Sequence, residues 1–316
     1  MTTKKRKATK RPARQSAKKA RAKKASSKRK SKRAAASAAA KKASPQSSLA
    51  AAASSRRSTE ERVAAMALAP AAVSESDANL QKLLGVLRDH GEPIQVRLAA
   101  LHTLGAAAFA VAEFEPCRGD YVAVLRELAT DPNPELRQRA LSTLASDKDG
   151  FAQKKLLEGL RKPDKALVPP EKALQLLAYD VHSDAYKAAR AVLEAPPNPE
   201  AKREALRLLS ADAKSAPMLE KVLLDKGEDR ENRQIAAAAL HALRPDRMQE
   251  RARDILLDAG EFPEIQATSL TALTQFGDQE KLAGDQPLLD RVGALRAASP
   301  AKVKQSARKF LDRYGG

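Results

Sequence analysis

Apolar residues in the C-terminal three quarters of the chain recur at helical spacing. The first such set is Leu80, Leu83, Leu84 and Leu87. Positions three and four residues apart lie on one face of an α-helix, where apolar side chains form a buried stripe. Comparable apolar stretches follow along the chain, and turn phrases rich in Pro, Gly and Glu separate most of them from a second helical stretch. The pattern predicts pairs of short helices joined by turns.

The second helix of each pair carries a repeated set of positions. A small residue recurs seven times at intervals of 31 to 40 residues, and Leu follows it four positions later each time. The small residues are Ala100, Ala140, Ala173, Ala205, Ala236, Ser269 and Ala307. Three positions before the small residue, five copies have a basic residue, namely Arg97, Arg137, Lys202, Arg233 and Lys304. These repeats predict an all-α fold, an α-solenoid of about seven helical hairpins over residues 78–316.

The phrase Asp-x-x-Pro-Glu-x-Arg-x-x-Ala-x-x-x-Leu, which begins at Asp131, resembles HEAT repeats, especially those called PBS-lyase HEAT-like. In that family the Asp before the turn and the Arg of the second helix tend to form a hydrogen-bonded ladder between repeats. Asp131 and Arg137 match these two positions, whereas Gly91, Pro196 and Gly227 replace the Asp elsewhere. The resemblance implies the fold and leaves the function open, because one fold hosts many functions.

Charge divides the chain into two parts. Residues 1–59 contain 21 Lys or Arg and no acidic residue, so the remainder holds 58 − 21 = 37 basic and 39 acidic residues. No Leu, Ile, Val or Phe precedes Leu49, and a segment with so little apolar surface cannot offset the entropy cost of ordering. We therefore expect a disordered basic tail at 1–57, a short helix with a linker at 58–77, and the solenoid at 78–316. In its Lys/Ala-rich composition the tail resembles those of linker histones and bacterial histone-like proteins.

A flexible polycation binds nucleic acid or another polyanion by releasing condensed counterions, without reading the bases. The tail is therefore expected to bind nucleic acid non-specifically. The residues expected to make these contacts are Lys4, Lys5, Arg6, Lys7, Lys18, Lys19, Lys23, Lys24, Lys28, Arg29, Lys30, Lys32 and Arg33. A targeting signal and a solubilising tail are alternatives that the composition leaves open.

Motifs for catalysis or metal binding are absent from the sequence. The four histidines have no second His or Cys at ligand spacing, Cys117 is the single cysteine, and no phosphate-binding Gly-rich loop occurs. We therefore expect no metal, no cofactor and no enzymatic activity. Two enzymes of the HEAT-like class remain alternatives, a bilin lyase and an alkylpurine DNA glycosylase. The glycosylases rely on aromatic side chains, Trp among them, and this chain has no Trp.

The sequence thus predicts a non-enzymatic adaptor or scaffold. Its tail would bind nucleic acid or another polyanion, and the solenoid would hold a protein partner on a concave face formed by second helices. The residues expected on that face are Arg97, Arg137, Lys202 and Arg233. No apolar run is long enough to span a membrane and no secretory signal is present, so we expect a cytoplasmic protein, nucleoid-associated in a bacterium or nuclear in a eukaryote.

Overall fold

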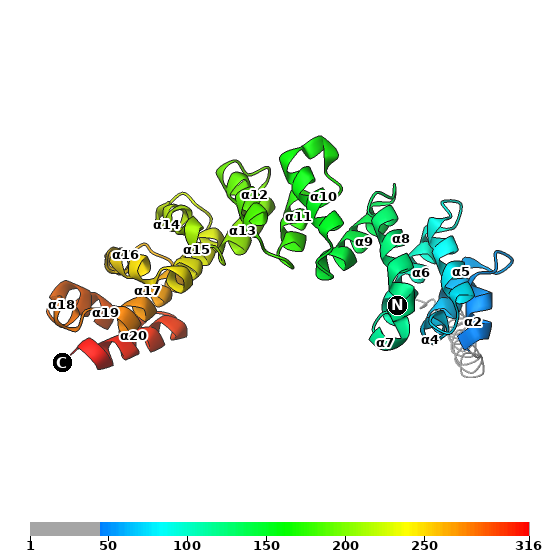
Figure 1. The fold of residues 1–316 in the computed structure, drawn as a ribbon. Helices are drawn as coiled ribbons and strands as arrows, with labels where there is room; N and C mark the ends of the chain where they lie inside the picture. The colour runs from blue at the N-terminus through cyan, green and yellow to red at the C-terminus, as the bar shows by residue number, and fades with distance from the viewer. Residues whose placement is uncertain (1–44, 316) are drawn as a thin grey trace, which may run out of the picture. The chain divides into compact units, whose positions relative to one another are not determined.

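The computed structural model describes residues 45–315, and within this range every regular element is a helix. The chain divides into two compact units at Val124 and Leu125, and each unit is described by itself. The basic residues from Lys4 to Arg33, predicted to contact nucleic acid, lie outside the described residues. The predicted all-α solenoid fold is confirmed, because helical hairpins follow one another through the described range (Figure 1).

The first unit, as far as it is described, covers residues 45–124. Its helices are α2 (Pro45–Ala52), α3 (Thr59–Met66), α4 (Pro70–Val73), α5 (Asp77–Arg88), α6 (Ile94–Ala107), α7 (Val111–Phe114) and the first part of α8 (Arg118–Leu128). The α3 helix begins at a capping box, in which Ser58 Oγ accepts from Glu61 N and Glu61 accepts from Ser58 N. The hairpin α5–α6 packs against α3 and α4.

Folded structure begins earlier in the chain than the sequence indicates. The α2 helix lies inside residues 1–57, for which disorder was expected, and α4 lies inside the expected linker. The α2 helix packs on α3 and α4, and its Leu49 and Ala52 are buried. Leu49 is the first large apolar residue after Met1 in the sequence, so α2 is the first segment that can bury apolar surface against the helices that follow.

The second unit covers residues 125–315. Its helices form successive hairpins, each made of a first helix, a turn and a second helix. These helices are α9 (Pro134–Ser146), α10 (Gly150–Arg161), α11 (Pro170–Leu177), α12 (Ser183–Glu194), α13 (Pro199–Leu209), α14 (Ala216–Leu224), α15 (Arg230–Leu243), α16 (Pro245–Leu257), α17 (Pro263–Phe276), α18 (Gln279–Ala283), α19 (Gln286–Ala298) and α20 (Ala301–Tyr314). Short 3₁₀ turns stand at Pro163–Lys165 and Ala213–Ser215.

The second helices α9, α11, α13, α15 and α17 contact one another in order, which gives this unit the arrangement of a HEAT-like helical solenoid. The predicted small residues Ala140, Ala205, Ala236 and Ser269 are fully buried on these helices. A small side chain lets neighbouring helices approach closely without leaving a void. The Ala repeat in the sequence therefore marks the helix–helix contacts of the stack.

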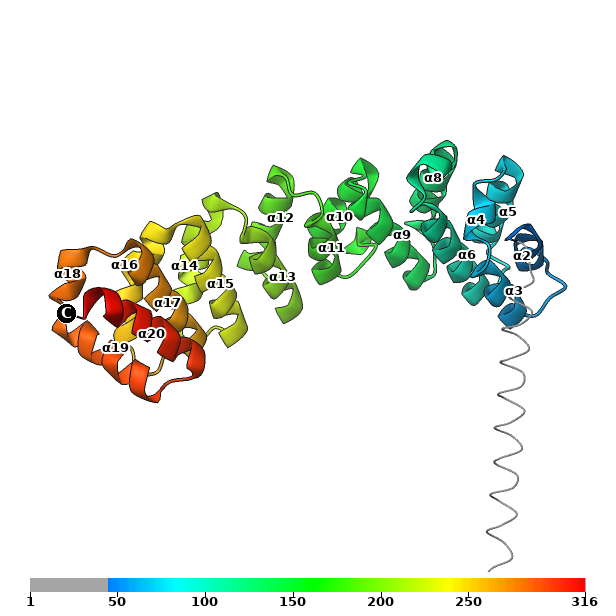
Figure 2. The ribbon, with the colours of Figure 1, turned by 90° about the horizontal axis from the view of Figure 1, so that it is seen from below.

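The last hairpin closes the core at the C-terminal end of the second unit. The α20 helix lies against α17 and α19 (Figure 2). Phe310 and Tyr314 of α20 belong to a buried cluster with Leu288 and Val292 of α19. The hydroxyl of Tyr314 donates to the backbone oxygen of Leu273 at 3.0 Å. The buried hydroxyl thus finds its hydrogen-bond partner in a carbonyl near the end of α17.

Among residues 45–315, none of the helices taken singly has the length and apolar content that crossing a membrane requires. One bent pair, Ile94–Ala107 with Val111–Leu128, meets the requirement of length and composition when the two segments are joined.

Candidate functional site

Arginines of the second helices cap the carboxyl ends of the helices before them. In three hairpins an Arg Nε donates to a backbone oxygen ten residues earlier: Arg62 to Ala52 at 2.9 Å, Arg97 to Leu87 at 2.9 Å and Arg233 to Leu223 at 2.8 Å. The last carbonyls of a helix have no partner within the helix and carry partial negative charge. A guanidinium placed there satisfies the carbonyl and compensates the charge.

The cation of one hairpin also binds an acidic residue in the turn of the next. Glu92 accepts from both terminal nitrogens of Arg62, at 2.6 and 2.7 Å, and Glu261 accepts from Arg233 at 2.6 Å. Glu228 accepts from the ammonium of Lys202. These ion pairs join successive hairpins within each unit. We call the set formed by Arg62–Glu92, Lys202–Glu228 and Arg233–Glu261 the turn ladder.

The acidic residue of the turn ladder stands in the phrase Asp-x-Gly-Glu. The phrase occurs at residues 89–92, 225–228 and 258–261. Its Asp caps the first helix, and one carboxylate oxygen accepts from the Gly N–H two residues later at 2.8 to 2.9 Å. The Glu then extends toward the cation of the preceding hairpin. Sequence reasoning assigned no role to these glutamates, although each directly follows a Gly in the turn, and two of these glycines, Gly91 and Gly227, stand at the position that Asp131 occupies in its own repeat.

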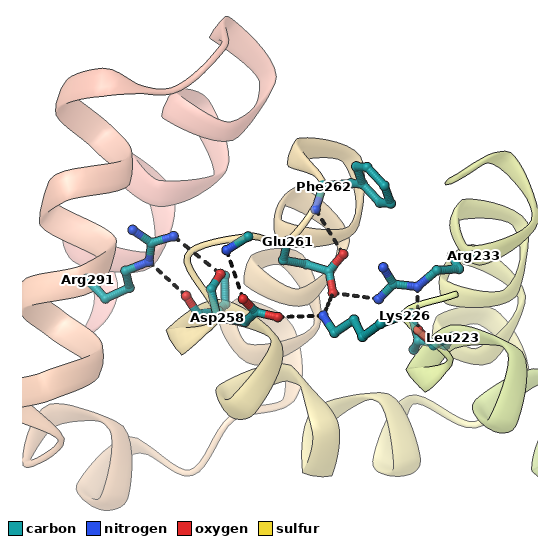
Figure 3. Close-up of polar contacts among 9 residues, drawn as sticks. Leu223, Lys226, Arg233, Asp258, Glu261, Phe262 and Arg291 are labelled. Atoms are coloured by element: carbon teal, nitrogen blue, oxygen red, sulfur yellow. Dashed lines mark hydrogen bonds and ion pairs between the residues drawn. The ribbon is translucent and has the colours of Figure 1, made fainter. Parts of the chain in front are cut away.

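The most deeply buried ion pair of the ladder lies around Glu261 (Figure 3). Its carboxylate accepts from Arg233, from Lys226 at 2.5 Å and from Phe262 N at 2.9 Å. Its side chain has no exposed surface, and that of Arg233 is only 3% exposed. Burial alone would raise the pKa of Glu261, but the hydrogen bonds from Arg233 and Lys226 outweigh it, so the pKa lies below its ordinary value. The carboxylate therefore stays ionised inside the protein.

Only part of the predicted concave face is available to a partner. Arg97 and Arg233 are buried, so these two side chains, which were predicted to contact a protein partner, offer almost no surface for such a contact. Their charge and hydrogen bonds serve the contacts within and between hairpins. Lys202 is half-buried on Glu228. Arg137 is half-buried and belongs to a different arrangement.

The turn ladder has a gap at Arg137 in α9. Its Nε donates to Leu167 O and its Nη1 to Asp131 O, both at 2.7 Å. No carboxylate of the described residues lies within ion-pair distance of its guanidinium, because the connection between α10 and α11, residues 162–169, has no Gly-Glu phrase. A pocket of about 790 Å³ opens here, with Arg137 among its lining residues.

Cys117 and the histidines form no reactive group that the structure shows. Cys117 is buried, and burial, followed by the charges of Asp77 and Asp120, raises the pKa of its thiol. Burial lowers the pKa of His241. Among residues 45–315, no three His, Cys, Asp or Glu side chains are placed to hold a metal ion.

Comparison with known proteins gave matches among solved structures. No protein-family model matches the chain, and no curated protein does. Among solved structures, the chain is similar to the complex of CpcE and CpcF of phycocyanin lyase from a Nostoc species. The match has 19% sequence identity and a TM-score of 0.38, and covers 81% of this chain and 95% of that chain.

This finding corrects one prediction from the sequence. The chain was expected not to be an enzyme, and that expectation is wrong as stated, because a structure of similar fold is part of a phycocyanin lyase. The absence of the motifs considered does not exclude an enzyme, since those motifs cover only a few kinds of chemistry. At this identity and TM-score the likeness concerns the fold alone and assigns no reaction or substrate to this chain.

We expect acid to destabilise the second unit through its buried carboxylates. Burial acts to raise the pKa of both Glu228 and Glu261, but hydrogen bonds hold it below the ordinary value of 4.5, those from Asn232 and Lys202 for Glu228 and those from Arg233 and Lys226 for Glu261. A lowered pKa in the folded state contributes stability that is present above about pH 4.5 and is lost as the pH falls through the folded-state pKa. The melting temperature, followed by circular dichroism, should therefore change little between pH 7 and 5.5 and fall steeply below pH 4.5. In the Glu261→Gln variant the melting temperature should fall less below pH 4.5. An equal fall in the variant and in the original protein would show that Glu261 does not cause the loss of stability.

Proposed function

We propose that this protein is an adaptor. Its helical part holds a protein partner, and its basic N-terminal segment attaches to nucleic acid or another polyanion. In this proposal residues 1–44 are the attachment segment, and the partner contacts lie on the helices. The proposal is independent of whether the helical part also has a catalytic activity.

The observation that carries the proposal is the division of charge between the two parts. All 21 Lys and Arg of residues 1–59 stand without a neighbouring acid in the sequence, whereas the rest of the chain is close to neutral. In the folded part, several cations are engaged in internal ion pairs: Arg62 with Glu92, Arg233 with Glu261, and both Arg247 and Arg251 with Glu220. The positive charge that is available to bind a polyanion is therefore concentrated at the N-terminus.

Exposed aromatic and aliphatic side chains support the protein-binding part of the proposal. Phe109 is 89% exposed and Val111 is 60% exposed, in the connection between α6 and α7 and at the start of α7. The chain has only ten Phe and Tyr residues and no Trp, so a fully exposed aromatic ring is unusual in this protein. Exposed apolar groups of this kind are enriched at protein interfaces.

We expect a protein partner to stay bound after nucleic acid is removed. The test is affinity purification of the tagged full chain from its native cells, with and without nuclease, and quantitative mass spectrometry of what is retained. Phe109→Glu should reduce retention of the nuclease-resistant partner by about tenfold or more, because it places a charge in an apolar contact. Gln95→Glu adds the same charge at an exposed site in the same unit and should leave retention unchanged. If nuclease removes every retained protein, the helical part is no adaptor.

A further inference from the structure

The pocket at the ladder gap is built by the connection between α10 and α11. This connection contains the 3₁₀ turn Pro163–Lys165 and folds back over α10 at Gly159, where a side-chain carbon would lie 3.0 Å from the Cα of Ala166. The opposite walls come from α11, α12 and the turn before α13. Its volume of about 790 Å³ falls within the range of roughly 300–1,000 Å³ found for small-molecule sites.

Two arginines are the charged residues among those that line this pocket, and no acidic residue lines it. Arg137 donates only to backbone oxygens. Arg161, at the end of α10, is exposed and forms no ion pair or hydrogen bond with any of the described residues. Elsewhere the equivalent cations Lys202 and Arg233 are neutralised by glutamates. The pocket thus carries two positive charges that pair with no carboxylate among residues 45–315.

The rest of the lining is aliphatic. Its buried part includes Val168, Ala173, Ala188 and Val192, and no aromatic ring lines the pocket. Such walls offer dispersion contacts and burial to a flexible aliphatic body, and they offer no stacking partner to a flat ring system. Asn198, the remaining polar side chain, is engaged, since its Oδ1 accepts from Ala201 N at 2.7 Å and its Nδ2 donates to Glu171 at 3.2 Å. The polar recognition available to a ligand is therefore that of the two guanidinium groups.

We propose that this pocket binds a small carboxylate with an aliphatic body. Its carboxylate would lie at Arg137 and Arg161, and its hydrocarbon part would pack on Ala173, Ala188 and Val192. Guanidinium groups favour carboxylates because their N–H donors match the two carboxylate oxygens. The protein's own N-terminal segment does not fit this site, because that segment is cationic. The proposal does not depend on the adaptor function.

The test is calorimetric titration of the full chain with octanoate as the probe, beside octanol and acetate. Octanoate should bind at one saturable site, while octanol, which lacks the charge, and acetate, which lacks the aliphatic body, should bind at least about tenfold more weakly. Arg161→Glu should weaken octanoate binding by about tenfold or more. Lys154→Glu makes the same charge change at an exposed site on α10 outside the pocket and should leave binding unchanged.

A second variant blocks the pocket sterically and leaves every charge in place. Ala191 is exposed on α12 and lines the pocket, so Ala191→Phe should fill it and remove octanoate binding without unfolding the helix. Equal binding to the original chain, to Arg161→Glu and to Ala191→Phe would overturn the proposal, since it would place octanoate on the basic segment. Absence of octanoate binding would also overturn it. So would a short peptide with a C-terminal Leu that binds much more tightly than octanoate, because the site would then be a peptide site.

Discussion

Deleting residues 1–44 is expected to remove nearly all salt-sensitive binding of duplex DNA by this protein. This segment holds 19 of the 21 basic residues that precede the first acid, since only Arg56 and Arg57 lie beyond it. If the segment neutralises about six to ten phosphates, the affinity of the full chain should fall about 10³–10⁵-fold between 50 and 200 mM salt. The truncated chain should bind weakly at both concentrations. Fluorescence anisotropy with a labelled duplex measures both affinities.

The structure determines where the truncated chain should begin. A chain starting at Ser58 would lose α2 and uncover the surfaces of α3 and α4 on which Leu49 and Ala52 pack, so a weaker affinity could reflect damage to the fold. Starting at Pro45 keeps this packing.

The matched control for the deletion keeps the length of the segment and replaces its Lys and Arg by Gln. This variant should behave like the truncated chain, and the affinity of the full chain should differ little among unrelated duplex sequences. Equal affinity and equal salt dependence of the full and truncated chains would locate DNA binding in the folded part and refute the role assigned to the segment.

The helical hairpins could be predicted because their signal is local. Apolar spacing along each helix, Pro and Glu at helix starts, and the buried Ala four residues before a Leu all reflect contacts that every hairpin repeats. Ala140 and Ala236 are fully buried, as the repeat implies. Because the pattern recurs seven times, a repeat that departs from it at one position does not obscure the periodicity. The fold class can therefore be predicted from the sequence alone.

The polar contacts could not be predicted because they join residues about 26 to 30 positions apart. An Arg on a helix is compatible with an exposed face and with a buried ion pair, and the neighbouring residues of Arg233 do not distinguish the two. The same limit applies to α2, whose Ala-rich composition suits either a free segment or a packed helix. The pocket could not be predicted either, because it depends on the path of the connection between α10 and α11 and on the placement of Arg137 in its lining.

Replacing Arg233 by Ala is expected to destabilise the second unit by about 3–5 kcal/mol, because it breaks a buried ion pair and leaves the carboxylate of Glu261 in the interior. Leu223 O loses its hydrogen bond as well. Urea unfolding followed by circular dichroism gives the free energy of unfolding. Arg207 of α13 is the matched control, because its own side chain is 50% exposed where it pairs with Glu204 and Glu231. Arg207→Ala should cost roughly 0–1 kcal/mol.

The double variant Arg233→Met with Glu261→Met separates the two sources of this loss. It removes both charges and fills the site with apolar side chains, so no unpaired ion remains. We expect it to be more stable than either single variant, Arg233→Met or Glu261→Met, with a strong interaction energy in the double-mutant cycle. Lys226 would then keep Asp258 as its partner at 2.6 Å. If Arg233→Ala costs no more than Arg207→Ala, the turn ladder is not what stabilises the stacking of the hairpins, and apolar contacts of the buried Ala and Leu residues carry it alone.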